Sequence, residues 1–160
     1  MPISDNDRLV LDTSIVIHYL RADSVGIYVE STYHLRNRGE VPIISIVTHA
    51  EVLSFANRRN WGEAKKDRLT ELIREFVVIP VDTQEIVDEY AKIDNYATAL
   101  PSSQKMGKND LWIAATASLA NARLLTTDRD FERIGGIFFH LALIDPSDPR
   151  PETTKSVEML

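Results

Sequence analysis

Short apolar runs alternate along the chain with longer stretches that place apolar residues at helical spacing. The short runs are rich in Val, Ile and Leu and have the length of buried strands. They are RLVLD (8–12), VPIIS (41–45), FVVIPV (76–81), RLLTT (123–127) and HLALI (140–144). The stretches between them predict helices over residues 14–21, 26–38, 48–59, 62–75, 83–98 and 109–122.

Apolar strands separated by helices are typical of a parallel sheet that is covered on both faces. We therefore predict an α/β protein, a three-layer α/β/α sandwich around a central parallel sheet of four to five strands. A chain of 160 residues fits one domain. We place this domain at residues 1–145 and expect the proline-containing segment 146–160 to form a flexible tail.

Composition narrows the class of protein. The N-terminus carries acids before any apolar stretch, which is not the pattern of a secretory signal, and no apolar run approaches the roughly 18 residues of a membrane span. The absence of cysteine fits a reducing compartment, so we expect a cytoplasmic protein without a membrane partner. A net charge of −6 argues against a polycation that binds nucleic acid over its whole surface. It leaves room for a nucleic-acid enzyme with local basic patches or bound cations.

Four acids follow the predicted strands or open the helices behind them. Asp12 ends the first strand, and Glu51 lies in the first turn of the helix after the second. Asp110 begins a helix so apolar that few of its positions can face water, and Asp128 follows the fourth strand. Function gathers where the carboxyl ends of parallel strands meet the next helices. We therefore expect the four carboxylates to share one edge of the sheet.

Each of these acids, taken alone, also has an ordinary structural explanation. Helix caps, capping boxes, helix dipoles and turns all favour acids at such positions. Asp12 could help to start a helix, although Thr13 or Ser14 is the better-placed cap, and Thr48 with Glu51 could form a capping box. Asp110 could interact with the helix dipole, with Asn109 as the cap, and Asp128 could be a turn residue. Capping does not require all four at one end of the sheet, so their conjunction favours a shared role.

Carboxylates that converge in a protein cleft repel one another strongly. Either several of them are protonated or a divalent cation lies among them. Hard oxygen ligands without histidine or cysteine select Mg²⁺ or Mn²⁺ over zinc. Magnesium keeps open coordination positions for substrate phosphate, so the pattern predicts an acidic Mg²⁺ or Mn²⁺ site for phosphoester chemistry.

Basic residues provide candidate contacts to a phosphate backbone. Arg58 and Arg59 lie near the helix that carries Glu51, and Lys105 and Lys108 lie just before Asp110. The default interpretation of the stretch RRNWGEAKK is a solvated helix face, and a phosphate-contact patch is the alternative. The histidines at 18, 34, 49 and 140 have no metal-ligand spacing and are interpreted as structural.

Four short motifs together resemble those of the PIN-domain ribonucleases, and in particular the VapC-type toxins of prokaryotic toxin–antitoxin systems. They are VLDTSIVI (10–17), THAEVL (48–53), NDLWIAATA (109–117) and LLTTDRDF (124–131), in the family's order. By this resemblance the four acids match the acidic positions of the family active site as catalytic and metal-binding residues. Supporting roles fall to Ser14 beside the first acid, to Thr126 or Thr127 before the fourth, and to Asp130 in the same turn.

The resemblance implies an α/β/α sandwich, one or two Mg²⁺ or Mn²⁺ ions and endonucleolytic cleavage of RNA. It also implies a homodimer and, for the toxin branch, a cognate antitoxin. Two alternatives stay open. One is a catalytically inactive PIN-like module that binds RNA or protein. The other is an aspartyl-phosphate phosphatase, whose chemistry requires a second acid two residues after the first, where this chain has Ser14.

Overall fold

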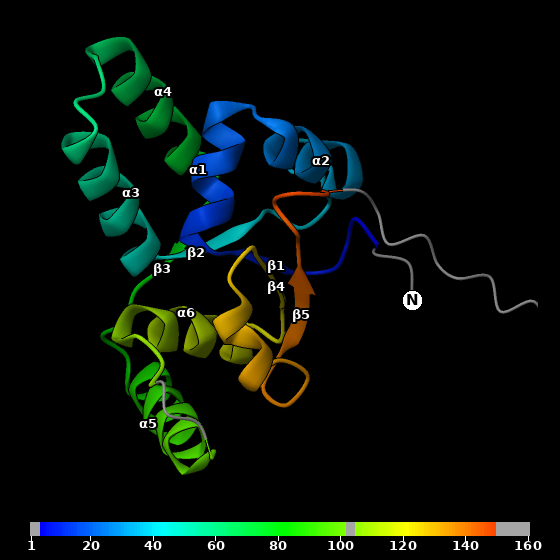
Figure 1. The fold of residues 1–160 in the computed structure, drawn as a ribbon, viewed down its shortest axis with the longest axis vertical. Coiled ribbons are helices and arrows are strands. Elements are labelled where there is room, and N and C mark those ends of the chain that lie inside the picture. Colours follow the sequence, from blue (N-terminus) through cyan, green and yellow to red (C-terminus); the bar gives the residue numbers. More distant parts are fainter. Residues whose placement is uncertain (1–3, 102–104, 150–160) are drawn as a thin grey trace, which may run out of the picture.

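The computed structural model describes residues 4–101 and 105–149, which form a parallel sheet with helices on both faces (Figure 1). The strand order is β3-β2-β1-β4-β5, and every pairing is parallel. The three-layer sandwich predicted from the apolar runs is therefore confirmed, with five strands. They are β1 (Leu9–Leu11), β2 (Ile43–Ser45), β3 (Val77–Ile79), β4 (Arg123–Thr126) and β5 (His140–Leu143).

In the described part of the chain, six α-helices and one 3₁₀-helix connect the strands. They are α1 (Thr13–Arg21), α2 (Ser24–Tyr33), α3 (Ile46–Arg58), α4 (Glu63–Arg74), α5 (Gln84–Ala99), α6 (Lys108–Leu119) and the 3₁₀-helix η1 (Arg129–Arg133). The predicted C-terminal ends of two helices were wrong. The second helix stops at Tyr33 instead of residue 38 because His34 takes the left-handed conformation, with φ of 51°. The last stops at Leu119 instead of residue 122, just before Asn121 turns left-handed at φ of 49°.

Alternate residues of the central strand face two separate hydrophobic cores. Leu9 and Leu11 belong to the core under α1, α2, α3 and α4, whereas Val10 belongs to the core under α5 and α6. Figure 1 shows these two groups of helices on opposite sides of the sheet. Burial on both faces requires strands that are apolar throughout, and β1 has no exposed residue. Because β1 packs against a core on each face, it holds Asp12, the residue that follows it, in a fixed position.

The chain changes its winding direction at β1. From this strand it proceeds through β2 to β3 on one side, and it returns to β4 and β5 on the other. The switch between two such directions opens a crevice at the carboxyl ends of the strands, where open α/β sheets place their ligands. The residues after β1 and β4 therefore face one another, and the Asp12 backbone N–H donates to the Leu125 carbonyl at 2.9 Å.

The predicted flexible tail lies mostly outside the described residues, because residues 150–160 are not described. Within the described residues, no helix is both long and apolar enough to cross a membrane.

Candidate metal centre

Asp12 lies between β1 and α1. Its backbone is extended, and its side chain accepts a hydrogen bond from the Thr13 N–H at 2.8 Å, so Asp12 is itself the N-cap of the helix. The assignment of the cap to Thr13 or Ser14 was wrong. The other carboxylate oxygen of Asp12, Oδ2, accepts hydrogen bonds from the Ser14 hydroxyl at 3.2 Å and from the Thr126 hydroxyl at 2.6 Å. These contacts fix the carboxylate in a buried position with 5% of its surface exposed.

Burial changes the acidity of Asp12. Desolvation raises its pKa from 3.8 to about 6, because it outweighs the hydrogen bonds from Thr126, Thr13 and Ser14, which lower it. The charge of Glu51 is a smaller contribution to the same rise. The site therefore holds a carboxylate whose negative charge the surrounding protein does not fully compensate.

Glu51 lies in the second turn of α3 instead of the first. The helix begins at Ile46, and the Ser45 hydroxyl caps it by accepting from the Val47 N–H at 3.1 Å. The capping-box alternative for Glu51 is therefore wrong. Its Oε1 instead accepts a hydrogen bond from the Thr13 hydroxyl at 2.7 Å, which ties α3 to the start of α1. Glu51 thus points toward the first acid.

Asp110 lies in the first turn of α6, as expected, but the residue in the N-cap position is Gly107 and not Asn109. The helix behind it is buried at Leu111 and from Ile113 to Ala117, which holds the carboxylate against the sheet edge. Desolvation, and after it the charges of four other acids, raise the pKa of Asp110 from 3.8 to about 7. Those acids are Asp12, Asp128, Glu51 and Asp130. The convergence that the strand ends predicted is therefore observed.

The turn after β4 brings two more carboxylates to the site. The Asp128 side chain caps η1 by accepting from the Asp130 N–H at 2.9 Å. Oxygens of Asp110, Asp128 and Asp130 all lie within 4.8 Å of one another, a spacing that one metal ion can bridge. Asp130 also forms an ion pair with Arg133 at 3.9 Å. Asp130, expected only as a supporting residue, thus belongs to the group with the closest carboxylate spacing.

The polar residues predicted to support the acids do so through distinct contacts. The Thr126 hydroxyl bridges two acids, since it donates to Asp12 and accepts from the Asp128 N–H at 2.9 Å. The Thr127 N–H donates to the Ser14 hydroxyl at 3.3 Å. Thr13 is a further supporting residue. The sequence favours it only as a helix cap, yet its hydroxyl donates to Glu51, and no spacing rule predicts this contact.

The donor set fits a hard divalent cation. Five carboxylates and the hydroxyls that hold them offer only oxygen, and the raised pKa values of Asp12 and Asp110 show unbalanced negative charge. Oxygen ligands of this kind suit Mg²⁺ or Mn²⁺. A cation among these carboxylates would relieve the repulsion that burial makes costly.

The predicted basic contacts fall in two places. Lys108 is the first residue of α6, two residues before Asp110, and Lys105 is exposed in the segment before it. Arg58 ends α3 and Arg59 follows it, so both lie more than one helical turn beyond Glu51. The first pair adjoins the acids, whereas the second marks a more distant surface.

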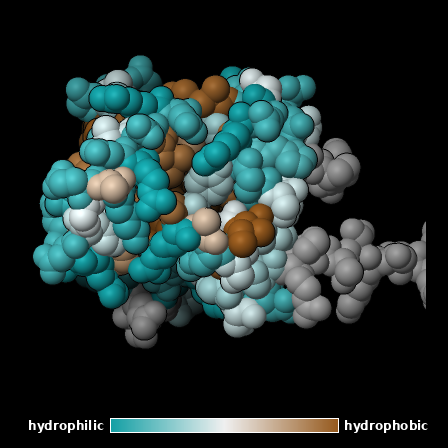
Figure 2. All heavy atoms as spheres, turned by 90° about the horizontal axis from the view of Figure 1, so that it is seen from above, coloured by the Kyte–Doolittle hydropathy of each residue, from teal (hydrophilic) through white to brown (hydrophobic). Residues whose placement is uncertain are grey.

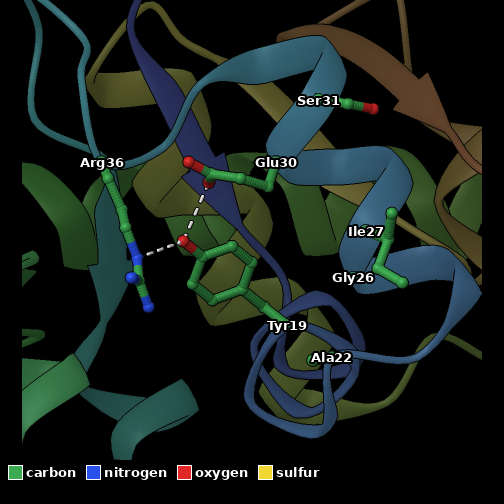
Figure 3. Close-up of a pocket in the computed structure, with 7 residues that line it drawn as sticks. All are labelled: Tyr19, Ala22, Gly26, Ile27, Glu30, Ser31 and Arg36. Atoms are coloured by element: carbon green, nitrogen blue, oxygen red, sulfur yellow. Dashed lines mark hydrogen bonds between the residues drawn. The ribbon is translucent and has the colours of Figure 1, made fainter.

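A cavity of about 430 Å³ lies away from the acids, between α1 and α2. In Figure 3 the Tyr19 hydroxyl donates to Glu30 at 2.8 Å and accepts from Arg36 at 3.0 Å. Figure 2, which views the molecule from the side of these helices, shows an apolar strip between two hydrophilic areas. None of the acids of the metal centre lines this cavity, so it is a separate feature.

Comparisons with known proteins agree with this geometry. Residues 9–137 match the PIN domain. Ribonuclease VapC1 of Haemophilus influenzae strain R2866 is 32% identical over 127 residues, which cover 78% of this chain and 90% of that protein. The structure of VapBC-1 from nontypeable Haemophilus influenzae is similar with a TM-score of 0.67 and 27% identity, covering 85% of this chain and 97% of that chain. The structure of VapBC2 from Rickettsia felis, bound to a promoter DNA fragment, is similar with a TM-score of 0.69 and 20% identity, covering 85% of this chain and 98% of that chain.

Proposed function

The chain belongs to the PIN-domain family, and within it to the VapC-type ribonucleases, and on this premise we propose that its acidic centre carries out metal-dependent endonucleolytic cleavage of RNA. The observation that carries the proposal is the convergence of the junction acids. Asp110, Asp128 and Asp130 lie within reach of one ion, and the charges of Asp12 and Glu51 act on Asp110 as well. Five carboxylates at one sheet edge are far more than helix capping requires.

Mg²⁺ or Mn²⁺ is the proposed ion, held among Asp12, Glu51, Asp110 and Asp128, with Asp130 as a further candidate ligand. Held by these residues, the ion would activate a water and would neutralise the charge that builds on the scissile phosphate. The residues of the chain prepare the site. Thr126 and Ser14 orient Asp12, Thr13 orients Glu51, and α6 holds Asp110 in place.

Basic side chains next to the acids are proposed to guide the phosphate backbone. Lys108 is the first residue of α6 and Lys105 lies in the segment before it, so both precede Asp110 closely in the chain. A polyanion gains little from a chain with a net charge of −6, so such local cations are needed to offset repulsion by the acids. Arg58 and Arg59 are proposed as more distant contacts.

A cleavage assay with labelled RNA tests the proposal. The wild-type protein is expected to cut internal bonds with Mg²⁺ or Mn²⁺ and to stop when a chelator removes the ion. Asp110→Asn is expected to abolish cleavage, whereas the matched control Asp67→Asn, an exposed residue of α4, keeps the wild-type rate. Cleavage by Asp110→Asn at the wild-type rate would refute the assignment. A wild-type protein that bound RNA without cutting it would instead be an inactive binding module.

The resemblance extends to a partner and an assembly. We propose a cognate antitoxin, encoded by an adjacent reading frame, because several similar structures are described as toxin–antitoxin complexes. Co-expression of that small protein is expected to suppress both RNA cleavage and growth inhibition.

A homodimer is proposed as well, and light scattering after size-exclusion chromatography would measure its mass. A nuclease domain over residues 1–145 and a cytoplasmic location complete the proposal.

A further inference from the structure

The α3–α4 hairpin carries a concentration of positive charge that the rest of the chain lacks. Residues 54–70 contain five Lys or Arg and two Asp or Glu, although the whole chain has a net charge of −6. Figure 2 shows a predominantly hydrophilic surface over α3 and α4. A local excess of this sign within an acidic protein is the electrostatic pattern expected where a polyanion is bound.

Aromatic rings hold several of these cations in defined positions. The guanidinium groups of Arg21 and Arg59 each lie 5.3 Å from the centre of the Phe55 ring, and the Lys65 ammonium lies 3.9 Å from that of Trp61. The two rings also contact each other edge to face at 5.7 Å. We call these five residues the basic–aromatic patch. Cation–π contacts restrain long side chains, so less entropy is lost when the cations bind a phosphate.

The cations of the patch are available to a ligand. Arg21 and Arg59 are exposed, and Lys65 is half-buried. Within residues 4–101 and 105–149, no carboxylate lies within ion-pairing distance of these three cations. Asp23 is near enough to Arg21 for the two charges to interact, but the three cations around the two rings still repel one another, and a bound anion would reduce this repulsion. The interaction of each cation with an aromatic ring leaves its N–H groups free to donate.

The patch lies on the same helix as one acid of the metal centre. Phe55 follows Glu51 by one helical turn, and residues four apart share a helix face. Along the axis, Phe55 lies about 6 Å and Arg59 about 12 Å from Glu51. On α1, Thr13 contacts Glu51 at the start of the helix and Arg21 contacts Phe55 at its end. The two helices thus join the acids to the patch.

We propose that the basic–aromatic patch binds the phosphate backbone of single-stranded RNA beside the cleavage site. The inference rests on the proposed nuclease function and assigns it a substrate-binding surface. An acidic centre repels RNA, so binding energy must come from cations that lie within a few nucleotides of it. The exposed guanidinium planes of Arg21 and Arg59 can also stack on bases that are unpaired, and this favours a single strand over a duplex.

The test measures RNA binding in a protein that does not cut. Asp110→Asn serves as the background, with a fluorescently labelled single-stranded oligouridylate of about 16 nucleotides as the probe. Adding Arg21→Gln and Arg59→Gln is expected to weaken binding about tenfold or more at 100 mM salt and to reduce the salt slope by about 1.4. The matched control, Arg74→Gln with Lys92→Gln, removes two positive charges elsewhere. It is expected to change neither the affinity for the probe nor the salt slope.

A second variant separates the rings from the charges. Phe55→Leu keeps an apolar side chain in place but removes the aromatic face. It is expected to weaken binding about two- to fivefold while the salt slope stays unchanged, because the cations remain but are less restrained. Thermal unfolding of each variant shows that it is folded.

Three results would overturn the inference. Salt slopes and affinities that match those of the control pair would show that the patch does not touch RNA. A patch variant that keeps RNA binding but loses binding to polyglutamate would assign the surface to an acidic protein segment. Equal loss for single-stranded and duplex probes would remove the preference for unpaired RNA. Failure of the nuclease proposal is distinguishable, since the wild type would then bind with the expected slope but never cleave.

Discussion

Replacing Asp110 with asparagine is expected to stabilise the metal-free protein above neutral pH. The carboxyl group has a folded-state pKa of about 7, against 3.8 in its ordinary environment, because burial and four neighbouring acids disfavour its charge. Between about pH 4 and pH 7 the folded protein therefore binds more protons at this position than the unfolded chain. Stability is lost as the pH rises through that window, and asparagine, which never ionises, avoids the loss.

The size of the effect follows from the pKa. A rise from 3.8 to about 7 corresponds to about 4 kcal/mol. Because the side chain is partly exposed, solvent screening reduces the expected gain to about 1–2 kcal/mol. In a domain of this length, that gain raises Tm by about 2–8 °C.

Thermal unfolding with a chelator at pH 8 and at pH 4 measures the gain. Asp110→Asn is expected to melt higher than the wild type at pH 8 and at nearly the same temperature at pH 4. Asp67→Asn, which removes one charge from an exposed position, controls for net charge and is expected to change stability by less than about 0.5 kcal/mol. With Mg²⁺ the order reverses, since the ion stabilises the wild type by about 2.7 kcal/mol at one hundred times its Kd. A lower Tm for Asp110→Asn at pH 8 without metal would refute the repulsion argument.

Three other substitutions test the supports of the site and of the fold. Thr126→Val removes a buried hydroxyl that donates to Asp12 and accepts from the Asp128 N–H. It is expected to lower the free energy of unfolding, measured by urea titration, by about 1–3 kcal/mol. Thr70→Val on α4 is the exposed control. Thr13→Val frees Glu51 and is expected to slow cleavage about 10- to 100-fold with Tm little changed; an unchanged rate would show that Glu51 needs no such support. Gly26→Ala brings a Cβ against the His18 carbonyl and is expected to cost about 1–3 kcal/mol by separating α2 from α1, measured by urea unfolding, whereas Gly62→Ala meets no neighbouring atom and should be nearly neutral.

The sheet and its acidic edge could be predicted because both follow from simple chain geometry. Continuous apolar runs specify strands buried on both faces, and parallel strands bring their carboxyl ends together. Asp12, Asp110 and Asp128 could therefore be placed at one edge from their positions alone. Helix ends were less predictable, since the left-handed conformation of His34 that ends α2 has no signal in an apolar pattern.

The local roles of polar residues could not be predicted from spacing. Thr-x-x-Glu has the form of a capping box, but α3 begins two residues earlier and Ser45 caps it, which leaves Glu51 free to contact Thr13. The closeness of Asp130 to Asp110 depends on how tightly the turn after β4 winds into η1. Such contacts are set by tertiary packing between α1, α3 and the turn, and no local rule describes that packing.

The bond between Thr126 and Asp12 joins residues 114 positions apart. The ribosome makes the first acid of the site before the hydroxyl that orients it and before the turn that carries Asp128 and Asp130. At about 5–20 residues per second, roughly 6–23 s separate the synthesis of the two ends of this bond. A nascent chain therefore contains Asp12 throughout that interval without a completed site. The acidic site can therefore form only after the turn that carries Asp128 and Asp130 has been made and has packed against the start of α1.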